Sequence, residues 1–284
     1  MIQEIWWGDS LDMMKNIKDG SVDMVLTDPP YGIDYADWDT LHNNTNAALS
    51  GESPAQKGTS FKRRGKPING WSSSDRNIGK EYQTWCSLWL SEVYRVTKPC
   101  SPILIFNSRR FYHRLCSAME DSGFHIKDML IWEKHKANGK AQNVNHIPAI
   151  KKSGLMLSNY RVGNLKPMFE PIAFGTKPYS HTISECIISY QIGGFYSEGT
   201  DIRSNIFKFQ SETGLHPTQK PVSLLETLIK TFTMENHMVL DCFSGSGSTL
   251  LAAKNLNRQY IGIENNKTFY DISVSRLHES NLFQ

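Results

Sequence analysis

Short apolar runs alternate with segments of helical periodicity along most of this chain. The apolar runs predict buried strands near residues 5–7, 22–26, 103–106, 124–132, 171–175, 239–240 and 260–263. Apolar positions three and four residues apart predict helices over residues 11–17, 81–96, 111–119, 222–232, 249–256 and 269–277. Alternating strands and helices favour an α/β fold with a doubly wound, mostly parallel sheet.

Two segments lack clear periodicity and interrupt this alternation. Residues 32–80 are rich in Asn, Ser, Gly and Lys, and we expect a long loop there. Residues 176–212 also show no regular apolar spacing. Long loops inside a compact domain are usually functional, so we expect one domain over residues 1–284 with two functional insertions.

The charge is distributed unevenly, although the formal net charge is only +3. No Asp or Glu occurs between Lys134 and Phe169, and a second basic cluster lies in the 32–80 segment. Segregated positive charge suits contacts with phosphate groups, and the alternative is a solvated surface. The candidate phosphate-binding residues are Lys57, Lys62, Arg63, Arg64, Lys66, Lys134, Lys136, Lys140, Lys151, Lys152 and Arg161.

Composition excludes several classes of protein. Hydrophobic residues make up 39% and charged residues 21%, which is typical of globular proteins. No apolar run reaches the roughly 20 residues that span a bilayer, and no signal peptide is evident, so we expect a cytoplasmic protein without membrane partners. The five cysteines form no CxxC pair and the histidines show no ligand spacing, so we expect free thiols, no disulfide framework and no metal site.

A glycine-rich loop joins the strand at 239–240 to the helix at 249–256. Its sequence, Asp241-Cys242-Phe243-Ser244-Gly245-Ser246-Gly247, lets backbone approach a ligand closely at a helix N-terminus. Glu264 ends the next strand, where an acid can accept hydrogen bonds from ribose hydroxyls. The spacing is neither a dinucleotide fingerprint nor a P-loop. A tight turn without a ligand is the alternative interpretation of the loop.

The tetrapeptide Asp28-Pro29-Pro30-Tyr31 follows the strand at 22–26. The prolines donate no ladder hydrogen bond, so the strand must end and leave Asp28 at its carboxyl end. A carboxylate, a rigid carbonyl and an aromatic ring can together grip a planar amine. Two acceptors on an aryl amine favour the tetrahedral, more nucleophilic nitrogen, and catalysis then depends on positioning and charge complementarity. A turn with a packed tyrosine is the alternative.

With these motifs, the chain resembles the β-group of amino-DNA methyltransferases, which includes restriction–modification and orphan adenine methylases. The tetrapeptide at 28–31, the loop at 241–247, residues 260–264 and the hexapeptide His216-Pro217-Thr218-Gln219-Lys220-Pro221 carry the resemblance. The catalytic tetrapeptide precedes the cofactor loop, as in this permuted group. One departure is Cys242, which stands where the group commonly has proline.

The resemblance implies a seven-stranded, Rossmann-like sheet with one antiparallel strand and S-adenosylmethionine as cofactor. It implies catalytic roles for Asp28, Pro29, Pro30 and Tyr31 on a base flipped out of double-stranded DNA. It places target recognition at about 176–212, with 32–80 as the other candidate for DNA contact, and has Lys220 or Thr218 near the cofactor carboxylate. The implied cofactor-binding residues are Asp9, Asp28, His216, Thr218, Gln219, Lys220, Asp241, Phe243, Ser244, Gly245, Ser246, Gly247, Ser248, Thr249, Glu264 and Asn265.

The expected reaction is methylation of adenine N6, because Asp in the first tetrapeptide position leans towards adenine in this group. Methylation of cytosine N4 is the main alternative, since it uses the same geometry on another exocyclic amine. A non-catalytic DNA-binding module is the alternative from another class, and it would not need Asp28 or the glycines. A cognate restriction endonuclease and a homodimer are partners that the resemblance leaves open.

Overall fold

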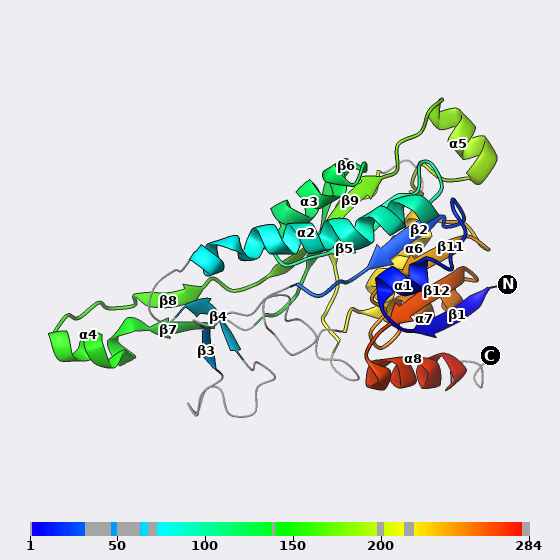
Figure 1. Cartoon of the computed structure of the whole chain (residues 1–284). Helices are drawn as coiled ribbons and strands as arrows, with labels where there is room; N and C mark the ends of the chain where they lie inside the picture. The colour runs from blue at the N-terminus through cyan, green and yellow to red at the C-terminus, as the bar shows by residue number, and fades with distance from the viewer. Residues whose placement is uncertain are drawn as a thin grey trace.

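A computed structural model describes residues 2–31, 47–49, 63–67, 73–137, 140–197, 202–212 and 219–279. One eight-stranded sheet forms the centre of this part of the chain (Figure 1). Its strands, in spatial order, are β1 (Gln3–Trp7), β12 (Gln259–Glu264), β11 (Met238–Asp241), β2 (Met24–Thr27), β5 (Pro102–Phe106), β9 (Phe169–Thr176), β6 (His125–Glu133) and β10 (Ile206–Lys208).

All neighbouring strands pair in parallel except β9, which runs antiparallel to both β5 and β6. The predicted α/β fold with a mostly parallel sheet and one antiparallel strand is therefore confirmed. The expected number of seven strands is one too low for the described chain. The additional strand is β10, a three-residue element at the outer edge of β6 that is too short for a periodicity argument.

Two groups of helices cover the sheet, one on each face. One face packs against α1 (Ser10–Met14), α2 (Ser73–Val96) and α3 (Tyr112–Asp121). The other packs against α6 (Val222–Phe232), α7 (Ser248–Asn255) and α8 (Lys267–Glu279). Successive strand side chains point to opposite faces, so Val25 and Ile105 join the first core cluster, and Leu26 and Phe106 join the second.

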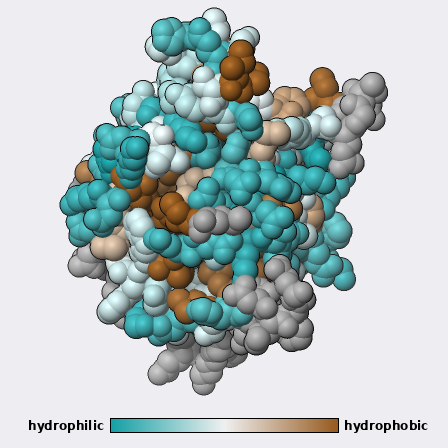
Figure 2. All heavy atoms as spheres, turned by 90° about the vertical axis from the view of Figure 1, so that its right-hand side faces the viewer, coloured by the Kyte–Doolittle hydropathy of each residue, from teal (hydrophilic) through white to brown (hydrophobic). Residues whose placement is uncertain are grey.

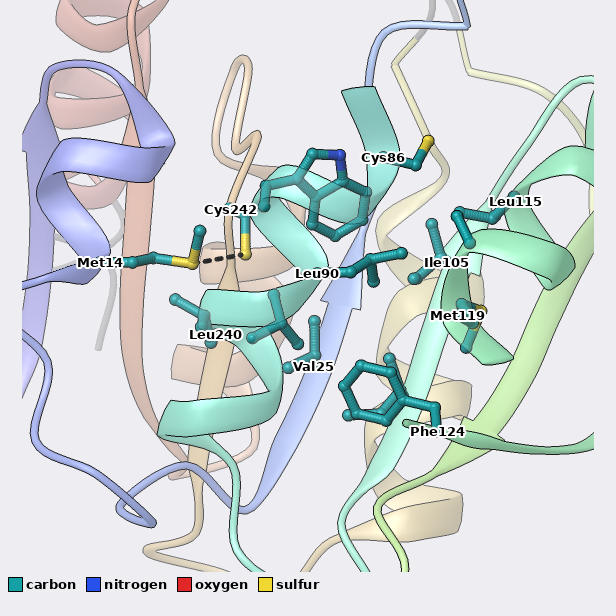
Figure 3. Packing of buried hydrophobic residues seen from close by; sticks show 14 of the residues in the cluster. Met14, Val25, Cys86, Leu90, Ile105, Leu115, Met119, Phe124, Leu240 and Cys242 are labelled. Atoms are coloured by element: carbon teal, nitrogen blue, oxygen red, sulfur yellow. Dashed lines mark hydrogen bonds between the residues drawn. The ribbon is translucent and has the colours of Figure 1, made fainter. Parts of the chain in front are cut away.

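Cys242 belongs to the first of these clusters, close to the start of the glycine loop. Figure 3 shows its thiol pointing towards Met14 of α1, and the two sulfur atoms lie 3.7 Å apart. Burial raises the pKa of the Cys242 thiol well above its usual value, so the side chain behaves as a small apolar group. Cys242, which stands where the group commonly has proline, therefore fits into the hydrophobic core.

The segment 32–80 contains more regular structure than its polar composition predicts. β3 (Ala47–Leu49) pairs antiparallel with β4 (Arg63–Pro67), and α2 begins at Ser73 rather than at residue 81. The prediction of one long loop is therefore wrong for these residues. The first turns of α2 were missed because their sequence, SSDRNIGK, contains one strongly apolar residue, Ile78, and therefore shows no apolar spacing. In the structure, Ile78 is buried in the core.

A basic arm, defined here as residues 134–168, leaves the sheet at the carboxyl end of β6 and returns into β9. Glu133 and Phe169 pair at its base. Its strands β7 (Lys140–Asn143) and β8 (Arg161–Asn164) form an antiparallel hairpin, and the connection between them holds η2 (Val144–His146) and α4 (Pro148–Ser153). Figure 1 shows the arm extending well beyond the sheet, with α4 at its far end.

The helix α5 (Ile183–Tyr190) lies at the opposite, amino edge of the parallel strands. It follows β9, whose last residue, Thr176, pairs with Pro102 at the start of β5. A disulfide joins Cys186 of α5 to Cys100 in the turn before β5, so the expectation of free thiols is wrong for this pair. The two cysteines are 86 residues apart in sequence, and only the return of β9 beside β5 brings them together.

The surface near the amino edge carries exposed apolar side chains on α5, including Ile187 and Ile188. In Figure 2 this hydrophobic group stands at the top of a face that is otherwise largely hydrophilic. Within the described ranges, none of the helices combines the length and the apolar character that crossing a bilayer requires.

The close approach of β12 to α7 gives a test of this packing. A Cβ atom on Gly262 would stand 2.3 Å from Cδ1 of the buried Leu250. We therefore expect Gly262→Ala to lower the free energy of unfolding by about 1–3 kcal/mol in urea denaturation, because Leu250 must move within a packed core.

The control is the double variant Gly262→Ala/Leu250→Ala. Leu250→Ala alone should cost about 2–5 kcal/mol by leaving a cavity. In the double variant the new methyl group occupies part of that cavity, so the total cost should be smaller than the sum of the two single costs. Additive costs would contradict the close contact between Gly262 and Leu250.

Candidate active site

The tetrapeptide Asp28-Pro29-Pro30-Tyr31 lies at the carboxyl edge of the sheet, directly after β2. The strand ends at Thr27 because Pro29 and Pro30 cannot donate ladder hydrogen bonds. Tyr31 folds back, and its hydroxyl donates a hydrogen bond of 2.7 Å to Oδ1 of Asp28. The Asp28 side chain is half-buried, with 24% of its surface exposed.

Asp28 and three other charged side chains form a buried cluster. The Lys220 ammonium donates a hydrogen bond to Oδ2 of Asp28, and it lies 3.6 Å from Oε2 of Glu170. Lys134 donates a hydrogen bond to Oε1 of the same glutamate. Lys220 also lies over the rings of Tyr31 and Phe106, at 5.7 and 5.1 Å from their centroids. The cluster therefore balances two carboxylates with two ammonium groups.

The pKa shifts in this cluster follow from burial and from the balance of charges. Burial raises the pKa of Asp28, and the Glu170 charge adds to this, while Lys220 and the Tyr31 hydroxyl oppose it. Burial alone would lower the pKa of Lys220, but the carboxylates of Asp28 and Glu170 outweigh burial and raise it. Burial and the charge of Asp28 raise the pKa of Tyr31, so its hydroxyl stays protonated and can donate.

Asp241 links the tetrapeptide to the glycine loop. It ends β11 beside β2, and its Oδ1 accepts hydrogen bonds from Thr27 Oγ1 at 2.7 Å and from Phe243 N at 3.1 Å. Burial raises the pKa of Asp241 to about 6, against the opposing hydrogen bonds from Thr27, Thr249 and Phe243. The charge on nearby Asp28 adds to the rise. The two predicted motifs therefore meet at one point of the sheet edge.

The glycine loop leads from β11 into α7. Gly245 and Gly247 adopt positive φ angles of +51° and +77°, and Gly247 forms the N-cap of α7. Apart from Gly245 and its two chain neighbours, no described residue has a heavy atom within 4 Å of the place where a Cβ on Gly245 would stand, so these residues leave space for a ligand there. Ser244 N donates to Ile263 O, and Arg276 braces the loop through Ser246 O and Ser248 Oγ.

Phe243 projects from this loop against the long helix α2. Its ring lies 5.2 Å from Trp89, edge to face, and 5.7 Å from Trp85. Trp85 also contacts the ring of Tyr82, whose hydroxyl accepts a hydrogen bond from Asn107 Nδ2 at 2.7 Å. These aromatic contacts fix the loop against the face of the sheet that carries α2.

Glu264 closes the other side of the loop at the carboxyl end of β12. Its carboxylate accepts hydrogen bonds of 2.8 Å from Gly245 N and from Asn266 N, and burial raises its pKa. Asp9 follows the neighbouring strand β1 and caps α1 by accepting from Leu11 N. The carbonyl of Asn265 accepts from Trp7 Nε1. The predicted acids Asp9 and Glu264 are therefore on adjacent strand ends.

Some predicted residues lie elsewhere or outside the described part of the chain. His216, Thr218, Lys57 and Lys62 fall outside it, and only the backbone is described for Arg63, Arg64, Lys66 and Lys140. Gln219 donates a hydrogen bond to Glu212, and Lys220, expected near the cofactor carboxylate, donates a hydrogen bond to Asp28. Lys134, expected to contact DNA phosphates, is bonded to Glu170 in the buried cluster.

Glu170 is the site residue that sequence reasoning missed. It precedes the strand predicted at 171–175 and is the first acid after the acid-free stretch. That position was a usable signal, because an isolated acid beside a buried strand needs a charged partner. The partners themselves, Lys134 and Lys220, were visible only after the strands had been placed.

Comparisons with known proteins agree with the motifs. A family model described as DNA methylase, covering N6 and N4 methyltransferases, matches residues 22–275. Type II methyltransferase M.HindIII of Haemophilus influenzae is 44% identical over 296 aligned residues, which cover 98% of this chain and 96% of the relative. Type II methyltransferase M.HinfI, also of Haemophilus influenzae, is 27% identical and covers 96% of this chain and 67% of its own length.

Two solved structures share the fold. The complex of M1.HpyAVI with S-adenosylmethionine superposes with a TM-score of 0.58 at 23% identity, over 98% of this chain and 99% of that one. The PvuII DNA methyltransferase, named as cytosine-N4-specific, gives a TM-score of 0.59 at 18% identity, over 96% and 85%. From the family match across most of its length and the 44% identity to M.HindIII, this chain belongs, as its motifs predicted, to the N6/N4 family of DNA methylases.

Proposed function

We propose that this protein transfers a methyl group from S-adenosylmethionine to N6 of a flipped adenine in double-stranded DNA. The observation that carries the proposal is the meeting of Asp28 and Tyr31 with the glycine loop through the Thr27–Asp241 hydrogen bond. That meeting supports the proposal because it brings the Asp28 carboxylate beside the glycine loop. Both lie at the carboxyl edge of the sheet, where ligands bind in α/β folds.

The residues of the tetrapeptide act on the amine by orienting it. When bound, S-adenosylmethionine supplies an electrophilic methyl group on a sulfonium ion. Asp28 accepts one amino hydrogen and the Pro29 carbonyl accepts the other, which draws the nitrogen lone pair out of the aromatic ring. Tyr31 stacks on the base and holds Asp28 through its hydroxyl. The fixed acceptors contribute to the rate because they need no reorganisation during the reaction.

The loop residues fit the cofactor that the family implies. The open space at Gly245 accommodates a ligand against backbone, and the N-terminus of α7 adds unpaired N–H groups. Glu264 is held in place by Gly245 N and Asn266 N, and its oxygens can accept further bonds from ribose hydroxyls. Asp241 supplies negative charge near a cationic ligand.

Cytosine N4 is the second candidate, because its amine can meet the same two acceptors. The PvuII enzyme, named as cytosine-N4-specific, has this fold, so the fold alone does not separate the bases. Asp28 favours adenine through the resemblance described above. The relatives named as type II methyltransferases support a role in restriction–modification with a cognate restriction endonuclease.

The basic arm is the surface that we assign to DNA. It starts at the same edge of the sheet as Asp28, and its described cations Lys136, Lys151, Lys152 and Arg161 are exposed. No acidic residue opposes them between Lys134 and Phe169. Positive charge on an extended arm beside the site suits a duplex whose flipped base enters that site.

The segment 176–212 is less suited to target recognition than the sequence predicts. Its first part, including α5, lies at the amino edge of the sheet, opposite Asp28. Its later part, β10, runs beside β6 and ends next to Glu133 at the base of the arm. We therefore propose that β10 and the arm, rather than α5, face the target sequence.

Replacement of Asp28 by alanine tests the catalytic assignment. We expect Asp28→Ala to bind S-adenosylmethionine but to lower turnover by a factor of about 100 or more, because the amine loses its charged acceptor. The measurement is nucleoside mass spectrometry of DNA from a methylation-deficient host that expresses each variant. N4-methylcytosine in place of N6-methyladenine would overturn the base assignment, and undiminished methylation would overturn the role of Asp28.

Asp241 should make cofactor binding depend on pH. Its pKa is raised to about 6, and a bound cation favours the ionised form, so binding at low pH must release a proton. We expect the affinity for S-adenosylmethionine, measured by calorimetry, to rise between about pH 5 and pH 7 and then to level off. Asp241→Asn should flatten this rise. An equally steep rise in that variant would assign the proton to another group, such as Asp28.

The arm should contribute directly to the salt dependence of DNA binding. We expect Lys151→Ala/Lys152→Ala to reduce the slope of log affinity against log salt by up to about 2, as two phosphate contacts are lost. Fluorescence anisotropy with a labelled duplex measures the slope. The matched control is Lys18→Ala/Lys230→Ala, which removes two exposed cations from connections leading to the amino ends of β2 and β11. Equal effects of the two pairs would contradict an arm-specific contact.

A further inference from the structure

The cluster around Asp28 already occupies both oxygens of the carboxylate that the target amine requires. Tyr31 donates to Oδ1 and Lys220 donates to Oδ2. An ammonium on Oδ2 stands where an amino group would donate, and its charge weakens that oxygen as an acceptor. The same carboxylate therefore has two competing donors, one from the protein and one from the substrate.

Glu170 offers the competing ammonium a second acceptor. Its buried Oε2 atom lies 3.6 Å from Lys220 Nζ, beyond hydrogen-bond distance, and within the described part of the chain no group forms a hydrogen bond to it. Its other oxygen, Oε1, is held by Lys134. Buried acceptors without partners are rare and costly, so an empty acceptor aimed at a nearby ammonium needs a reason.

A move of Lys220 from Asp28 to Glu170 is short and keeps all charges paired. A charged hydrogen bond has a donor–acceptor distance of about 2.8 Å, so Nζ needs to approach Oε2 by only about 1 Å. The lysine stem has several rotatable bonds and can make this movement. Lys220 keeps a carboxylate partner throughout, so no buried charge is left unpaired, which would cost several kcal/mol.

We propose that Lys220 is a placeholder for the target amine, and that Glu170 is the positioning residue that receives it when the base arrives. In the free enzyme, Lys220 holds the Asp28 carboxylate in its binding geometry. On entry of the base, the amine takes Oδ2 of Asp28 and the ammonium shifts to Oε2 of Glu170. This inference rests on the proposed function, since it concerns how the same amine reaches Asp28.

The exchange can be measured through the amine preference of the enzyme, defined as the ratio of its affinities for two duplexes. One duplex carries adenine at the methylated site, which is identified by sequencing the modified host DNA. The matched duplex carries purine, which lacks the 6-amino group, at the same position. We expect the wild type at pH 8 to bind the adenine duplex about tenfold more tightly than the purine duplex, because the amino group adds one hydrogen bond to a charged acceptor.

Glu170→Gln should reduce this ratio to about one to two, because the neutral amide no longer offers Lys220 a carboxylate in place of Asp28. Lys220→Met should keep the ratio near tenfold or above, since the competitor is gone. The double variant Glu170→Gln/Lys220→Met should restore the ratio to about tenfold, because it also lacks the competing ammonium group. Glu92→Gln is the matched control. The Glu92 side chain is 25% exposed, close to the 23% of Glu170, and it is ion-paired with Arg95 near the turn before β2, away from Asp28, so this variant should leave the ratio unchanged.

Each outcome separates the inference from the proposed function. A Glu170→Gln variant that binds S-adenosylmethionine normally and keeps the full amine preference overturns the placeholder role. A loss that Lys220→Met does not rescue also overturns it, because Glu170 would then act only on folding or packing. If wild-type DNA carries no methylated base at all, the proposed function fails, and this inference fails with it.

Discussion

The parallel pairing of β2 with β11 is the constraint on which the site depends. It brings Thr27 and Asp241, which are 214 residues apart in sequence, into one hydrogen bond at the carboxyl edge of the sheet. Every other part of the site is arranged around that point. The prolines send the chain after Thr27 out of the sheet, and the glycines turn the chain after Asp241 into α7. A shift of either strand by one residue would point its side chain to the opposite face and break this hydrogen bond.

Electrostatic balance is the second requirement, because the edge gathers several acids in a buried place. Asp28, Asp241 and Glu264 all have a raised pKa, for which burial is the main cause. The protein stabilises each acid differently: Asp28 has an ammonium partner, Asp241 has hydroxyl and backbone donors, and Glu264 has backbone donors alone. Of these three acids, Asp28 is the one that is paired with an ammonium group in the described structure.

Much of the fold could be predicted from the sequence, and the reason is local. The core strands and α6, α7 and α8 carry enough apolar residues in regular spacing to identify them. The motifs at 28–31 and 241–247 could be placed because prolines and glycines limit the backbone by themselves. By contrast, β7, β8, α4 and α5 are short and polar or isolated, so their spacing carries little information.

The parts of the site that the sequence did not predict depend on long-range contacts. Glu170 meets Lys220 only because β9 enters the sheet antiparallel, which brings its first residues to the edge where the parallel strands end. Cys100 meets Cys186 for the same reason at the other end of β9. Neither pair follows from spacing, since one reversed strand determines both.

The position of β1 has a consequence for how such a protein could be rebuilt. β1 pairs along its whole length with β12, and α8, the helix that follows β12, packs against β1. A peptide that joins the end of α8 to the start of β1 would close these elements into a ring without disturbing the sheet. New ends could then be cut between α5 and β10, and the glycine loop would come before the catalytic tetrapeptide in the gene. The order of the motifs would be reversed, while the site in space would remain the same.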